Sequence, residues 1–188
     1  MIQPLRTLIL ATAATASLFA VGCGNKEDVV TEGKTEGIYL DVGELKYQVQ
    51  ISRQLNPYDT EDKEYLTAVP VGQRILKPGE TWFGVFMRVQ NDTELPHPSA
   101  REFEIEDTQG EKFRPVPLPL VNGYAYRPNP SVLPSQVLPK PNSTAGFGST
   151  RGSLLLFKLK TSTLALRPLV LKITPPGGGT KGEVDLDV

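Results

Sequence analysis

The stretch TWFGVFMRVQNDTELPHPSAREFEIEDTQGEKFRPV, residues 81–116, decides the fold of this 188-residue chain. Its first part places apolar side chains at every second position: Phe83, Val85, Met87 and Val89. Side chains two positions apart in a strand share a face, so this spacing predicts a long strand with a buried face. Phe103 and Ile105 repeat the pattern after a loop. Asp107 and Gly110 then suit the first and fourth positions of a type I turn, which predicts a hairpin closed by a glycine bulge.

Apolar patterns on both sides of this stretch predict further strands. Between residues 45 and 52, apolar and polar residues alternate, as in a strand with one solvated face. Residues 154–159 are mainly leucine and predict a strand buried on both faces at its start, and alternation over residues 169–173 predicts the last strand. Roughly six to eight short strands favour an all-β, immunoglobulin-like two-sheet antiparallel sandwich over residues 37–175. We expect residues 176–188 to be a disordered tail.

The N-terminal residues have the composition of a secretory signal. Arg6 is the only charged side chain before Cys23, and small residues at positions 20–22 end the uncharged run. The run resembles the lipobox of bacterial lipoproteins, with Ala20 where leucine is most usual. This resemblance implies a lipoprotein signal peptide over residues 1–22. It also implies that Cys23 carries the lipid (diacylglycerol, with palmitate-type chains) as the first residue of the mature chain.

Two alternatives for the N-terminus remain open. An uncleaved transmembrane anchor would use the 19 uncharged residues from Thr7 to Asn25, which is near the lower limit for a span. Ordinary secretion, with Cys23 incidental, is the other. Cys23 is the only cysteine, so its thiol has no intramolecular disulfide partner, and lipidation gives it a role. Residues 23–36 are mostly polar and predict a flexible tether that holds the domain on the extracytoplasmic side of a bacterial membrane.

The charge balance argues against nucleic acid as a partner. The whole chain has a formal net charge of −1, and removing residues 1–22 takes away one arginine and no acidic residue. The mature chain is therefore close to neutral and contains no basic run, whereas nucleic-acid binding requires concentrated positive charge.

Few residues of the chain are suited to catalysis or metal binding. His97 is the only histidine, so neither a second imidazole ligand nor an HExxH motif is present. Residues 59–66 hold the acidic cluster Asp59, Glu61, Asp62 and Glu64. This cluster indicates either a calcium site or a short helix with Asp59 or Thr60 as its N-cap. The sequence predicts no cofactor and no enzymatic activity.

A proline-rich insertion occupies residues 114–142. Pro115, Pro117 and Pro119 would leave one side of an extended chain without N–H donors, so this segment is expected at a sheet edge or leaving the sheet. Further along are three residues of types enriched at protein interfaces: Tyr124, Tyr126 and Arg127. Either they contact a partner, or the two rings pack down over the sheet as a lid.

The strand ending at Val89-Gln90-Asn91, followed by Phe-x-Ile-x-Asp-x-x-Gly-x-x-Phe over residues 103–113, resembles telokin-like immunoglobulin domains of bacterial extracellular lipoproteins. The resemblance covers residues 37–175. It implies an immunoglobulin-like fold and an extracellular location, but it implies no catalytic residues. The sequence thus predicts a membrane-anchored extracytoplasmic lipoprotein that acts as a non-enzymatic protein- or envelope-binding module. The alternative is a small-ligand or metal-ion carrier of the cell envelope.

Overall fold

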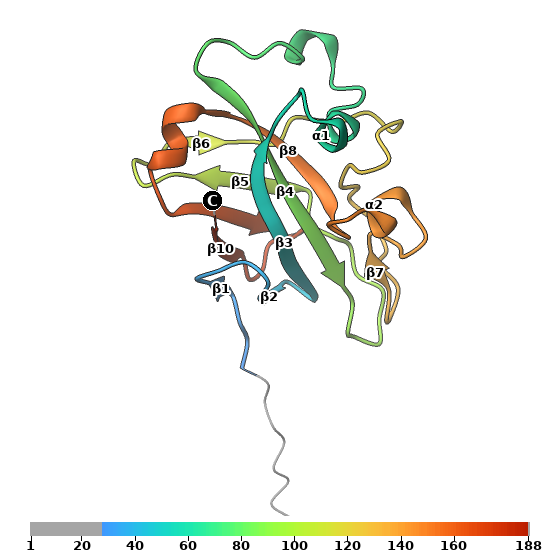
Figure 1. The fold of residues 1–188 in the computed structure, drawn as a ribbon. Coiled ribbons are helices and arrows are strands. Elements are labelled where there is room, and N and C mark those ends of the chain that lie inside the picture. Colours follow the sequence, from blue (N-terminus) through green and yellow to red (C-terminus); the bar gives the residue numbers. More distant parts are fainter. Residues whose placement is uncertain (1–27, 188) are drawn as a thin grey trace, which may run out of the picture.

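Two β-sheets packed face to face form the body of the protein in a computed structural model that describes residues 28–187 (Figure 1). The predicted signal peptide, Cys23 and the first part of the predicted tether lie outside the described residues. Within residues 28–187, no helix is both long and apolar enough to cross a membrane.

Sheet A has the strand order β1–β10–β9–β5–β6. Its strands are β1 (Glu32–Gly33), β5 (Glu102–Glu106), β6 (Lys112–Phe113), β9 (Leu169–Thr174) and β10 (Gly182–Leu186). Sheet B has the order β2–β3–β4–β7, with β8 also paired to β4. Its strands are β2 (Tyr39–Val42), β3 (Leu45–Leu55), β4 (Glu80–Gln90), β7 (Val137–Leu138) and β8 (Ser153–Lys160). All pairings within these sheets are antiparallel except β1 with β10, so the predicted two-sheet sandwich is confirmed.

Short helical turns connect the strands. They are α1 (Thr60–Tyr65), η1 (Val71–Gln73), α2 (Thr144–Phe147) and η2 (Thr161–Ala165). The predicted helix start is confirmed, because the carboxylate of Asp59 accepts hydrogen bonds from the backbone N–H groups of Glu61 and Asp62. The predicted turn after β5 is also present. Gly110 adopts φ +81° there, and its N–H donates to the carbonyl of Asp107 at 3.0 Å.

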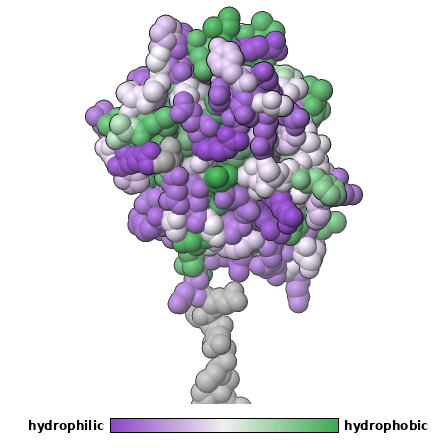
Figure 2. Space-filling model, in the orientation of Figure 1, coloured by the Kyte–Doolittle hydropathy of each residue, from purple (hydrophilic) through white to green (hydrophobic). Residues whose placement is uncertain are grey.

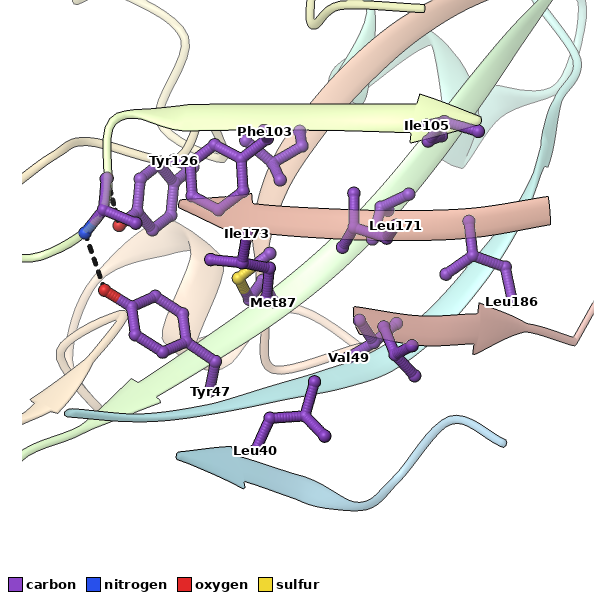
Figure 3. Packing of buried hydrophobic residues seen from close by; sticks show 14 of the residues in the cluster. Leu40, Tyr47, Val49, Met87, Phe103, Ile105, Tyr126, Leu171, Ile173 and Leu186 are labelled. Carbon is purple, nitrogen blue, oxygen red and sulfur yellow. Dashed lines mark hydrogen bonds between the residues drawn. The ribbon is translucent and has the colours of Figure 1, made fainter. Parts of the chain in front are cut away.

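The main core lies between the two sheets (Figure 3). The alternating residues of β4 that predicted it are all fully buried: Phe83, Val85, Met87 and Val89. The intervening residues of β4 were not expected to be buried. Trp82 and Phe86 nevertheless form a second core with Tyr65 of α1 and with Leu154 and Leu156 of β8. Sheet B is therefore covered on its outer face as well, by α1 and by the proline-rich insertion.

The described part of the predicted tether is packed rather than free. Val30 accepts a hydrogen bond from the backbone N–H of Asp41 at 2.6 Å, and β1 pairs in parallel with β10. The carboxylate of Glu36 accepts from the backbone N–H groups of Ser52 and Asp187. The prediction of a flexible tether up to residue 36 is corrected accordingly, because β10 offers this segment an edge to pair with.

The predicted disordered tail is wrong. Residues 177–179 are glycines that all adopt positive φ, and they reverse the chain after β9. β10 then pairs with β9 over five residues, with Val184 and Leu186 buried in the main core. The alternation of Val184 and Leu186 was a strand signal, but a five-residue pattern beside a glycine run is weak on its own.

Candidate functional site

The proline-rich insertion leaves sheet A after β6 and continues along the free edge of β8. The N–H of Val116 donates to the carbonyl of Leu156 at 2.6 Å, and the N–H of Tyr126 donates to Leu154 at 2.8 Å. This agrees with the prediction that prolines 115, 117 and 119 force the chain out of a central position. The insertion thereby covers a strand edge that would otherwise be open to pairing with another chain.

Tyr126 belongs to the interior. Its hydroxyl donates to the carbonyl of Ala100 at 2.9 Å, and its ring lies edge-on to Phe103 at 5.0 Å (Figure 3). The side chain is only 7% exposed, and burial raises its pKa above the ordinary tyrosine value. Tyr126 therefore matches the lid interpretation and presents almost no surface to a partner.

Tyr124 and Arg127 lie partly exposed but are engaged within the protein. The hydroxyl of Tyr124 donates to the carboxylate of Glu64 at 2.6 Å, and this hydrogen bond raises the pKa of Tyr124 to about 12. The guanidinium of Arg127 donates to the carbonyls of Leu118 at 2.7 Å, Pro119, and Asn122 at 3.3 Å. These contacts hold the insertion in shape, so both side chains have a structural role here.

Asn122 is a residue whose importance the sequence did not reveal. Its side chain is 3% exposed and donates to the carbonyls of Tyr65 at 2.9 Å and Thr67 at 2.8 Å. Its side-chain oxygen accepts from the N–H groups of Tyr124 and Ala125. Asn122-Gly123 was recognisable only as a turn, whereas its amide in fact joins the insertion to the end of α1.

The acidic cluster is used for internal contacts. Asp62, 3% exposed, accepts two hydrogen bonds from the guanidinium of Arg53 and one from the N–H of Asn56 at 2.7 Å. Glu61 accepts from the hydroxyls of Ser149 and Tyr65, and these hydrogen bonds lower its pKa. Within residues 28–187, no group of three or more histidine, cysteine or acidic residues is placed to hold a metal ion.

His97 lies in the loop after β4, and backbone hydrogen bonds to Val132 hold it there. Its N–H donates to the carbonyl of Val132 at 3.1 Å, and the N–H of Val132 donates back at 2.8 Å. The side chain is partly exposed. The loop that carries His97 is thus tied to the insertion.

A groove of about 750 Å³ lies between the start of β5, the insertion and β8. This size is in the range of ligand-binding sites. Its lining includes apolar side chains of the insertion and of β8. It also includes nine charged residues, six basic and three acidic: Arg101, Lys112, Arg114, Arg127, Lys172, Lys181, Glu102, Glu104 and Glu183. The groove is therefore positive, although the chain as a whole carries a formal charge of −1.

The basic side chains of the groove differ in how far they are neutralised. Lys112 lies 2.8 Å from Glu104, whereas Arg114 is 3.9 Å from the same carboxylate and its side chain is 86% exposed. Arg101 and Lys181 are exposed, and neither side chain has an ion pair or hydrogen bond within residues 28–187. Two cations in the groove are thus available to an external group.

Comparison with known proteins gives no family. No family model matches the chain. A search of curated proteins finds no match either. Among solved structures, the chain is similar to the yjhA protein from Bacillus subtilis, with a TM-score of 0.46 and 12% sequence identity, over 82% of this chain and 99% of that chain. It is also similar to an uncharacterized β-sandwich protein from Clostridium difficile 630, with a TM-score of 0.44 and 12% identity, over 82% and 95% of the two chains. Both likenesses are too distant to carry an argument about function, and the fold assignment rests on the sheets themselves.

Proposed function

We propose that this chain is a membrane-anchored extracytoplasmic lipoprotein whose β-sandwich is a non-enzymatic protein- or envelope-binding module. The observation that carries the proposal is the single cysteine, Cys23, placed directly after an uncharged run that ends in small residues. A diacylglycerol on this thiol supplies two acyl chains, which is sufficient for stable anchoring. The resemblance of residues 37–175 to telokin-like domains of bacterial lipoproteins supports the same extracytoplasmic location.

The packing of the N-terminal segment supports a short connection to the membrane. Six residues, 24–29, separate Cys23 from Val30, whose N–H donates to the carboxylate of Asp41 at 2.8 Å. The seven steps from Cys23 to Val30 span at most about 25 Å when fully extended. An anchored sandwich would therefore stay close to the bilayer, with the connection between α1 and β4 at its far end (Figure 1).

Two surface features of the sandwich support a binding role. Figure 2 shows mostly hydrophilic side chains on the face drawn, with an apolar group at the end formed by the α1–β4 connection. Val71 and Ile75 of this connection are 79% and 81% exposed. The positive groove beside β5 is the second feature that a partner could recognise. The carboxylates that suggested a metal-ion carrier each bind another group of the protein, so no specific observation favours that alternative.

Metabolic labelling with a fatty-acid analogue tests the anchor. We expect label on the wild-type chain and none on Cys23→Ala, because the thiol is the proposed attachment atom. Gly24→Ala is the matched control, since it changes the neighbouring residue and keeps the thiol, and it should be labelled like the wild type. Label that persists on Cys23→Ala would contradict the proposal.

A further inference from the structure

The loop before β5 and the strand itself form a continuous edge that faces the insertion and β6. At its start, alternate residues donate hydrogen bonds across this edge. The N–H of His97 donates to Val132 at 3.1 Å, and the N–H of Ser99 donates to Asn129 at 2.8 Å. In an extended chain, the N–H and C=O groups of successive residues point to opposite sides. The N–H and C=O groups of the odd-numbered residues here therefore point toward the insertion.

The far end of the same edge is paired with β6. The N–H of Asp107 donates to the carbonyl of Glu111 at 3.1 Å, and Ile105 lies opposite Phe113 in the antiparallel ladder. Both residues are odd-numbered, so the alternation that begins at residue 97 continues to residue 107.

Arg101 and Phe103 interrupt this series. By the alternation, their N–H and C=O groups also point across the edge. The ladder of β5 with β6 stops at Ile105 and Phe113, and within the described residues neither Arg101 nor Phe103 forms a backbone hydrogen bond across the edge outside that ladder. The residue that would face Phe103 next in the ladder is Pro115, which has no N–H. The chain turns away at that point, since the N–H of Val116 donates to Leu156 of β8. One position of β5, Phe103, and one just before the strand, Arg101, therefore open into the groove.

We propose that this groove binds a peptide segment with acidic side chains, in extended conformation, as a short strand added to the edge of β5. The inference rests on the proposed function as a binding module and names the class of its partner. The peptide backbone would pair with the open groups of Arg101 and Phe103, the mode by which exposed sheet edges bind peptides. Its acidic side chains would meet the unpaired cation of Arg101 and the exposed one of Arg114.

The open edge favours a peptide over other anions. A strand advances about 3.3 Å per residue, so Arg101 and Phe103 present two sets of donors and acceptors about 7 Å apart. A second polypeptide offers complementary N–H and C=O groups at the same repeat, whereas a phosphate polymer or an acidic glycan offers no such alternation. The segment is short because pairing with the insertion and with β6 closes the edge at both ends.

Titration calorimetry on the full-length chain in detergent tests this inference. The probe is an acetylated and amidated three-residue peptide of alternating glutamate and valine (Glu-Val-Glu), since only two positions of the edge are open. We expect it to bind, and to bind more weakly as salt is raised from about 50 mM to about 500 mM, because salt screens exposed charge. The double variant Arg101→Glu/Arg114→Glu should lose at least about tenfold in affinity. Lys63→Glu/Lys140→Glu changes the net charge equally at exposed lysines outside the groove and should stay within about twofold of the wild type.

Two further probes separate strand addition from simple charge attraction. The same peptide with N-methylated amides at alternate residues keeps its charge but cannot donate to the edge, and we expect its binding to be lost. Retained binding of that peptide, or equally tight binding of polyphosphate, would overturn the inference, as would no binding of the parent peptide. Labelling of Cys23 without peptide binding would overturn this inference alone and leave the anchored module standing.

Discussion

At the scale of single residues, two buried tyrosines hold the N–H and C=O groups of one residue, Ala100. The hydroxyl of Tyr47, from β3, accepts from the N–H of Ala100 at 2.6 Å, while Tyr126 donates to the carbonyl of the same residue (Figure 3). Burial raises the pKa of Tyr47 to about 12 and raises that of Tyr126 as well. The neutral phenols are therefore part of the folded state, which makes stability sensitive to alkaline pH.

The sign of this sensitivity follows from the raised pKa values. A tyrosine in the unfolded chain titrates near about pH 10. The contribution of each buried phenol is therefore fully present below about pH 10. Above it, stability falls by about 1.4 kcal/mol per pH unit for each tyrosine until the folded-state pKa is reached. We expect urea denaturation at a series of pH values to show this decline between about pH 10 and about pH 12.

Tyr47→Phe should make the free energy of unfolding fall less steeply with pH in the alkaline range. It should also lower the free energy of unfolding at neutral pH by about 1–3 kcal/mol, because the buried N–H of Ala100 loses its acceptor. Tyr58→Phe is the control, since Tyr58 is 86% exposed, and it should change neither quantity. An unchanged alkaline slope in Tyr47→Phe would show that its ionisation is not coupled to folding.

At the scale of elements, Asn122 joins the insertion to the end of α1. Replacing it with alanine removes four hydrogen bonds and leaves the carbonyls of Tyr65 and Thr67 without their side-chain donor. We expect Asn122→Ala to lower the free energy of unfolding by about 2–3 kcal/mol. Limited proteolysis should cut faster within residues 115–130, since local opening exposes the backbone. Asn142→Ala, at an exposed asparagine, should behave like the wild type, and equal proteolysis of both variants would contradict this role.

The C-terminal strand gives a second prediction at this scale. Val184 and Leu186 are 1% and 4% exposed, so Leu186→Ala should lower the free energy of unfolding by about 2–4 kcal/mol. Deleting residues 181–188 should be more damaging, because it also removes the partner of β1. Thr180→Ala, just before the strand and exposed, is the control. A chain without residues 181–188 that unfolds at the same urea concentration as the wild type would restore the disordered-tail interpretation.

How much the sequence predicts depends on whether a pattern is local. The period-2 residues of β4, the Asp59 cap and the Asp107 turn depend on nearby residues, and each was predictable. The burial of Trp82 and Phe86 was not, because the segments that cover them come from α1 and from the insertion. These contacts join residues that are distant in the chain, and no single-sequence spacing encodes them.

In the candidate site, too, local features were predictable from the sequence and contacts between distant residues were not. The prolines predicted that the chain would leave the sheet, but the gap they create at Arg101 and Phe103 depends on where residues 129–132 return to pair. The interface residue types at Tyr124, Tyr126 and Arg127 were conspicuous in the sequence. Their composition alone could not decide between partner contact and a lid, because both uses favour large amphipathic side chains.

At the scale of the whole molecule, the N-terminal attachment sets how far the groove lies from the membrane. The connection from Cys23 to Val30 would keep the sandwich within about 25 Å of the membrane surface. The groove lies on the side of the sandwich beside β5 and the insertion. A partner bound at the edge of β5 would therefore be held near the membrane surface.

The intact mass of the native protein, purified from membranes of its own host, tests the lipid anchor. We expect a chain that begins at Cys23 and carries the added mass of a diacylglycerol on its thiol. An unmodified chain that begins at Met1, or a mature chain with a free thiol at Cys23, would contradict it.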